Sequence, residues 1–171
     1  MTKFIKVNMI IRLNHVTIRT AYPERMKKFY SEILSMEKDR RRPDHFAGFH
    51  LRSMTSSGEP LIHVMTGEDA QINDGTIPIE RGGAVHHIAF YCQGFEKIRA
   101  QLSKFKIDWR EYRIPEFGLW QIFVFDPHGI LLELTFESAV EGIVEPPIPK
   151  DKLLDPKDRS WFNQESYAIF G

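Results

Sequence analysis

Four polar residues stand at matching places in two halves of this chain, each within a run that is typical of a β-strand. His15 lies in LNHVTIRT and His87 in VHHIAFYC, 72 residues further along. His63 lies in PLIHVMTG and Glu133 in ILLELTF, 70 residues further along. Two such similar offsets through a whole strand and helix pattern indicate an internal duplication. The duplication gives three imidazoles and one carboxylate symmetric positions.

The apolar neighbours of these four residues predict which way they point. Successive residues of a strand face opposite sides of a sheet, and the residue after each of the four is apolar and suited to pack under a helix. The four polar groups then share the other side, where a curved sheet would gather them at a cost unless they bind something. Two histidines and one carboxylate on one side of an ion leave positions open for substrate and dioxygen, as in non-haem Fe(II) enzymes. We therefore expect His15, His87 and Glu133 to be metal ligands, and His86 to be structural.

The elements that must position these residues follow from periodicity and turn residues. A helix is expected from Pro23 through Leu34, and a second, amphipathic one covers FEKIRAQLSKF. Strands are expected at 13–20, 45–54, 60–67, 85–92, 107–114, 120–126 and 130–136. The prolines of the segment after Phe136 keep it extended, and its aromatic end is expected to pack on the domain or on a partner subunit.

Composition narrows the class of protein. The chain has 171 residues, 42% of them hydrophobic and 27% charged, which is typical of a soluble globular protein. A formal net charge of zero gives no support for a nucleic-acid or membrane partner. The single cysteine, Cys92, excludes an internal disulfide and fits a reducing compartment, so we expect a cytoplasmic location. No apolar run is long enough to cross a bilayer.

The motifs LNHV, HHIAF and DPHGILLEL together resemble those of the vicinal oxygen chelate superfamily. That superfamily includes glyoxalase I, methylmalonyl-CoA epimerase, type I extradiol dioxygenases and bleomycin-resistance proteins. The resemblance covers about 12–136 and implies an α+β fold. Two βαβββ modules, 12–67 and 84–136, would form a curved mixed sheet around a metal cup, with the helices on the convex side. An N-terminal extension, 1–11, and a C-terminal tail, 137–171, lie outside it, and a homodimer is expected because related proteins are commonly dimeric.

His63 is the position that discriminates between reactions. Extradiol dioxygenases hold the metal with two histidines and one glutamate, and a further histidine near this place acts as an acid–base residue. Glyoxalase-like and epimerase-like members have a fourth metal ligand here. An imidazole suits both roles, and both stay open.

Other positions depart from each pattern. Extradiol dioxygenases have a tyrosine where this chain has Phe123, and a second active-site histidine where it has Ile114 or its neighbours. Glyoxalases often have an arginine where it has Trp120. Phe117, Trp120 and Phe123 would make an apolar substrate pocket that accepts an aromatic ring, or would pack in the core. His45, His50 and His128 have no symmetric partner, and we interpret them as surface or structural residues.

Three functions follow from the resemblance. The favoured one is an extradiol-type dioxygenase that uses Fe(II) on a small catechol-like substrate with vicinal oxygens. The second is a glyoxalase I-like lyase or isomerase, or an epimerase, which acts through a metal-bound enediolate on Mn, Zn, Ni or Co. The third is a non-catalytic binding protein of the bleomycin-resistance type. Members of that third type typically lack the metal ligands that this chain keeps.

Overall fold

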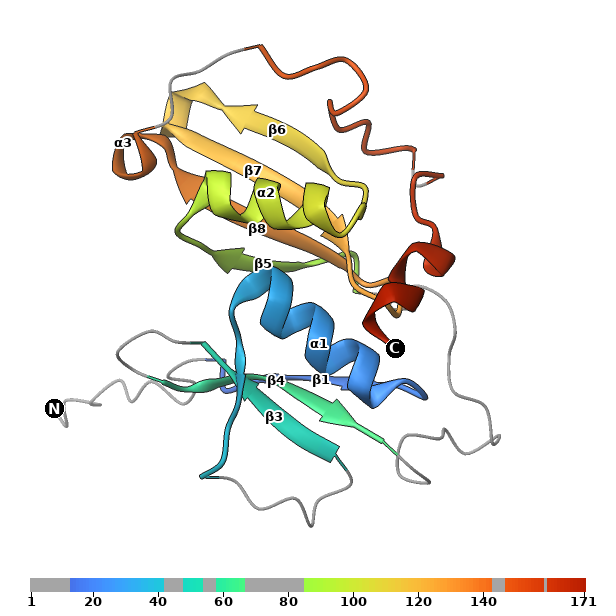
Figure 1. Ribbon diagram of the computed structural model, residues 1–171. Helices are drawn as coiled ribbons and strands as arrows, with labels where there is room; N and C mark the ends of the chain where they lie inside the picture. The colour runs from blue at the N-terminus through green and yellow to red at the C-terminus, as the bar shows by residue number, and fades with distance from the viewer. Residues whose placement is uncertain (1–12, 42–47, 54–57, 67–84, 143–146, 159) are drawn as a thin grey trace, which may run out of the picture.

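The computed structural model of the chain describes residues 13–41, 48–53, 58–66, 85–142, 147–158 and 160–171. They form two modules, each a four-stranded mixed sheet with one long helix (Figure 1). Module one consists of β1 (Val16–Arg19), α1 (Pro23–Leu34), β2 (Glu37–Lys38), β3 (Gly48–Arg52) and β4 (Pro60–Met65). Module two consists of β5 (Ile88–Tyr91), α2 (Phe95–Lys104), β6 (Arg110–Ile114), the 3₁₀ turn η2 (Pro115–Phe117), β7 (Leu119–Phe125) and β8 (Leu131–Glu137).

The two sheets have the same topology. Their strand orders are β1-β4-β3-β2 and β5-β8-β7-β6. In both sheets the first strand runs parallel to the last, and the other pairs are antiparallel. The α+β class and the two βαβββ modules predicted from the sequence are thus confirmed. The one strand that escaped prediction, β2, is only two residues long and carries no periodicity.

The predicted single curved sheet is replaced by two separate sheets. Among the strands that the structure describes, β1 pairs only with β4, and β5 only with β8, so both are edge strands. The physical reason lies in α1, which packs on its own sheet and also against α2 of module two. Figure 1 shows α1 between the two sheets. A helix is about 10 Å across, so in this position it holds the two sheets apart.

Helix α1 can fill this position because it is apolar on a wide face. Pro23 occupies its first turn, where a missing N–H does no harm, and the helix ends at Ser35 in a left-handed conformation. Met26, Phe29 and Tyr30 have no exposed surface. The helix as a whole contacts β2, β3 and β4 of module one and α2 of module two.

The C-terminal tail packs on α1, as the aromatic composition predicted. Its last element is the 3₁₀ helix η3 (Gln164–Phe170). The rings of Tyr167 and Phe170 contact that of Phe29, with centroids 5.7 and 5.8 Å apart. Earlier in the tail, the ring of Trp161 packs on that of Phe125, with the ring centroids 4.4 Å apart. No helix in the described part of the chain combines the length and the apolar character needed to span a membrane.

A buried hydrogen bond ties α1 to module two. The hydroxyl of Tyr30 donates to Asp126 Oδ2 at 3.0 Å. The other oxygen of Asp126 accepts from the backbone N–H groups of His128 and Ile130 at 2.8 and 2.9 Å. Burial raises the pKa of Asp126 to about 6, because removal from water penalises the carboxylate more than these donors stabilise it.

This raised pKa predicts a specific pH dependence of stability. The folded state binds the proton of Asp126 more tightly than the unfolded state, so the free energy of unfolding falls as the pH rises from below 4 to above 6. A shift of this size corresponds to on the order of 2–3 kcal/mol. Asp126→Asn keeps an acceptor for both backbone N–H groups and cannot ionise. Urea unfolding at several pH values should show the wild type losing this stability relative to Asp126→Asn, and parallel pH profiles would contradict it.

Candidate metal centre

Module two brings together two of the predicted ligands. His87 Nε2 lies 3.3 Å from Glu133 Oε2. The pairing of β5 with β8 explains why the two side chains are close. Ala89 is the parallel partner of Glu133, and His87 lies two residues before Ala89 on the same side of the strand. Two ligands of one ion at 2.0–2.2 Å are about 3.0–3.5 Å apart at octahedral or tetrahedral angles. The His87 and Glu133 pair therefore has the donor types and the spacing of two ligands of one metal ion.

Two buried polar side chains orient the Glu133 carboxylate. Gln121 Nε2 donates to its Oε1 at 2.6 Å, and Thr135 Oγ1 donates to the same oxygen at 3.1 Å. The sequence analysis missed both residues. The feature that could have revealed them is the pairing of β7 with β8. It sets Gln121 opposite Thr135, which lies two residues after Glu133 on the same face of β8. Such contacts fix the direction in which a carboxylate presents its free oxygen to an ion.

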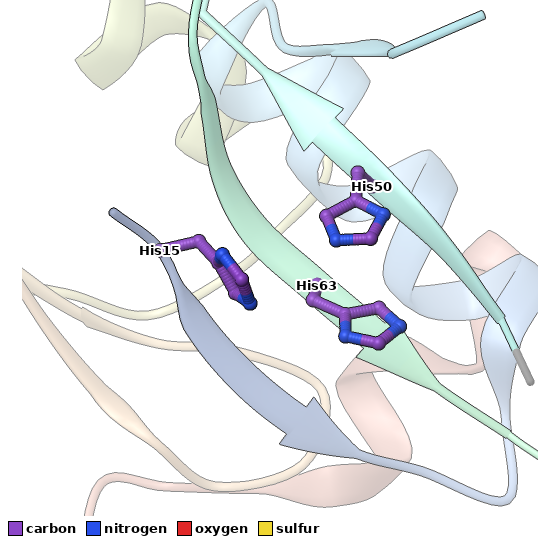
Figure 2. Close-up of side chains that lie close together, drawn as sticks. All are labelled: His15, His50 and His63. Atoms are coloured by element: carbon purple, nitrogen blue, oxygen red, sulfur yellow. The ribbon is translucent and has the colours of Figure 1, made fainter. Parts of the chain in front are cut away.

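Module one gathers three histidines on one side of its sheet. His15, His50 and His63 each offer a ring nitrogen, and these atoms lie within 4.8 Å of one another. In Figure 2 the three rings project from three neighbouring strand segments toward a common space, with α1 behind the sheet. His50 and His63 are cross-strand partners. Their rings stack with centroids 4.1 Å apart and an angle of 10° between the ring planes. His15 meets both edge-on, at 5.3 and 5.8 Å between centroids.

His50 was interpreted from the sequence as a surface or structural residue, but the structure buries it within this cluster. Its position depends on the antiparallel pairing of β3 with β4, which sets it opposite His63. That register is set by long-range contacts, and the duplication offered no signal because module two has Phe123 at the matching place, opposite Glu133. A histidine two residues after the Phe-Ala-Gly of HFAGFH carries no periodic pattern of its own.

The four residues singled out by the duplication form two groups. His15 joins His63, and His87 joins Glu133, each group on the helix-free side of its own sheet. In the part of the chain that the structure describes, the group of three or more potential metal-binding side chains is the histidine cluster of module one. The separation of the two sheets by α1 keeps the two groups from forming one centre within a single chain.

The three aromatic residues expected to form a substrate pocket lie in different surroundings. Trp120 is buried beneath α2, where its indole Nε1 donates to Glu111 at 3.0 Å and its ring packs on Phe95. Phe123 lies on the other face of β7, opposite Glu133. An odd spacing along a strand sends Trp120 and Phe123 to opposite faces. Phe117, in η2, is 76% exposed. The three therefore line no common pocket within one chain.

The structure thus combines two βαβββ modules with potential metal-binding side chains on their helix-free faces, and the family comparison agrees with this two-module fold. Residues 12–134 match the family model of the Glyoxalase/Bleomycin resistance protein/Dioxygenase superfamily. The chain belongs to this superfamily. No curated protein matches the sequence.

Solved structures show the same fold. A glyoxalase family protein from Bacillus anthracis is 22% identical, with a TM-score of 0.56 over 77% of this chain and 98% of its own. The fosfomycin resistance protein FosX from Listeria monocytogenes is 20% identical, with a TM-score of 0.55 over 79% and 100% of the two chains. FosX from Mesorhizobium loti is 19% identical, with a TM-score of 0.52 over 78% and 98%. At such identities the likeness extends to the fold alone.

The role of Gln121 can be tested on the metal-free protein. Gln121→Leu keeps most of the side-chain volume and removes the donor to a partly buried carboxylate, which should lower the free energy of unfolding by about 1.5–3 kcal/mol. The exposed Gln93→Leu should change it by less than about 0.5 kcal/mol. If Gln121 acts through Glu133, its loss should matter much less in a Glu133→Ala background, where that acceptor is absent. Equal effects in the two backgrounds would show that Gln121 stabilises something else.

Proposed function

We propose that the protein is a metal-dependent enzyme whose divalent ion is held by His15, His87 and Glu133. In this proposal His15 comes from one copy of the chain, and His87 and Glu133 come from a second copy. The observation that carries it is the arrangement of the two groups: each sits beside an edge strand, on the helix-free face, with α1 holding the sheets of one chain apart. A second copy whose β5 lies beside β1 of the first would bring the groups together.

The edges of β1 and β5 support such a dimer. Large apolar side chains lie exposed beside them: Leu13 is 78% exposed before β1, and Val85 and Tyr91 are 57% and 79% exposed around β5. Exposed edge strands flanked by apolar side chains are unfavourable in water and favour pairing with another chain. In a two-fold dimer, a β1 edge that meets a β5 edge does so twice, and two equivalent sites result.

The donor set fits a divalent transition metal. Two imidazoles and one carboxylate suit Fe(II), which we favour, and also Mn, Zn, Ni and Co. Such an ion would polarise two adjacent oxygens of a bound substrate and stabilise the negative charge that develops on them. The side chains of the protein would orient the ligands and exchange protons with the substrate. Glu133 is oriented by Gln121 and Thr135, and His63, beside His15, is in reach of a substrate oxygen as a proton donor or acceptor.

The favoured reaction is dioxygenation of a small aromatic substrate with vicinal oxygens, such as a catechol. The two-histidine, one-carboxylate set leaves open positions on one side of the ion, and His63 supplies an acid–base group there. The buried ring of Phe123, directly opposite Glu133, gives this face an apolar wall. An aromatic substrate would pack against such a wall.

One observation favours a lyase, isomerase or epimerase reaction instead. The ring nitrogen of His63 lies within 4.8 Å of that of His15, close enough for small side-chain rotations to make both of them ligands of one ion. Four protein ligands would suit proton transfer on a substrate that chelates the ion, a reaction that needs no dioxygen. The two reactions thus differ in the role of His63.

Mixing two inactive variants tests the shared site. His15→Ala and Glu133→Ala should each lose turnover, because each removes a ligand from both sites of the dimer. When the two proteins are unfolded together and refolded, random pairing makes half of the dimers mixed, and each mixed dimer carries one intact site. Turnover should therefore recover to about a quarter of the wild-type value. A mixture that stays inactive, with mixed dimers shown by mass spectrometry, would place all ligands within one chain.

Turnover under argon decides between the two reactions. For a dioxygenase, turnover of a catechol requires Fe(II) and oxygen, and His63→Ala keeps the metal while turnover falls by roughly 10²–10⁴-fold. For a lyase or isomerase, activity persists under argon with Zn or Co, and His63→Ala weakens metal binding itself. Full activity under argon with a redox-inert metal would contradict the dioxygenase proposal.

A further inference from the structure

We propose that His15, His50 and His63 bind one transition-metal ion within a single chain, without any residue of a second copy. It shares His15 and His63 with the proposed catalytic centre but needs neither His87 nor Glu133, and it does not depend on the proposed reaction. It gives His50 a ligand role that nothing in the duplication predicted.

The geometry of the cluster supports three nitrogen ligands. The donor atoms converge from β3, β4 and the segment that enters β1, to within 4.8 Å of one another (Figure 2). Ligands at 2.0–2.1 Å from a tetrahedral ion are about 3.4 Å apart, so side-chain rotations that move the nitrogens by an ångström or so complete the site. The rings of His50 and His63 stack with centroids 4.1 Å apart, so a rotation of one ring about its side-chain torsions is needed to direct both nitrogens to a common point.

The orientation of His15 is already set by a neighbour. His15 Nδ1 lies 2.6 Å from the side-chain oxygen of Asn14, which accepts the hydrogen bond. Nδ1 therefore carries the proton, and the lone pair of Nε2 is left for an ion. A hydrogen bond on the far nitrogen is the usual way in which proteins fix the tautomer of a metal-binding histidine.

The chemistry of the donors selects the class of ion. Three neutral imidazoles and no carboxylate suit Zn²⁺, Co²⁺, Ni²⁺ or Cu²⁺, whereas Mg²⁺ and Ca²⁺ require oxygen ligands. Three protein ligands leave a fourth position for water. Because β1, β3 and β4 belong to one sheet, the backbone holds all three histidines in register before any second copy binds.

The experiment uses the full chain in a background that removes the pair in module two. The His87→Ala, Glu133→Ala double variant is prepared metal-free and titrated with Co²⁺, whose visible absorption reports tetrahedral nitrogen ligation. One Co²⁺ per chain should bind, and Zn²⁺ should displace it. Adding His50→Gln should weaken Co²⁺ binding by at least about 10-fold, the lower end of what even second-sphere changes cause. Adding His86→Ala, which removes an exposed histidine outside the cluster, should leave the affinity unchanged.

The outcomes separate this site from the proposed catalytic one. The inference is overturned if the double variant binds no Co²⁺, or if His50→Gln leaves the affinity unchanged. Circular dichroism and urea midpoints check that each variant is folded. If His50→Gln does not fold, His15→Gln, at the partly exposed start of β1, must give the same loss. Failure of the catalytic proposal has a different signature, namely a Glu133→Ala enzyme that keeps its turnover, and that result leaves Co²⁺ binding by the double variant unaffected.

Discussion

The packing of α1 between the two modules is the interaction on which the rest of this structure depends. Its apolar face is fully buried, and Tyr30 reaches from it to the carboxylate of Asp126 in the turn between β7 and β8. That hydrogen bond lies in a low-dielectric setting, where a misplaced partner would leave a buried carboxylate poorly solvated. It therefore favours one relative placement of the modules, which the tail reinforces through Tyr167 and Phe170.

This placement has a direct consequence for the chemistry. With α1 between the sheets, the two sheets do not join, and β1 and β5 remain edge strands among the described strands. Each face then carries half of the proposed ligand set, and each half has polar or ring contacts of its own. Glu133 is satisfied by His87, Gln121 and Thr135, and the module-one histidines pack ring on ring.

Comparison of two glutamates shows how surroundings separate structural from chemical carboxylates. Glu111 lies beneath α2, where the indole groups of Trp109 and Trp120 donate to it at 2.9 and 3.0 Å and Arg99 forms an ion pair at 3.1 Å. Its oxygens are committed and fully buried. Glu133, on the opposite face of the same sheet, keeps one oxygen directed at His87 and partly open to solvent. Trp120 points into the core rather than into a substrate pocket, because its indole N–H donates to the buried Glu111 there.

The sequence by itself determined the local features: the helix from Pro23 to Leu34, most strands, the duplicated modules, and the common face of His87 and Glu133. These follow from periodicities of 3.6 and 2, which are properties of neighbouring residues. Only the tertiary structure decided that the sheets are separate and that His50 joins His15 and His63. Those outcomes depend on strand register and on which flank of α1 meets module two. Both are set by contacts between residues far apart in the chain, which no local pattern encodes.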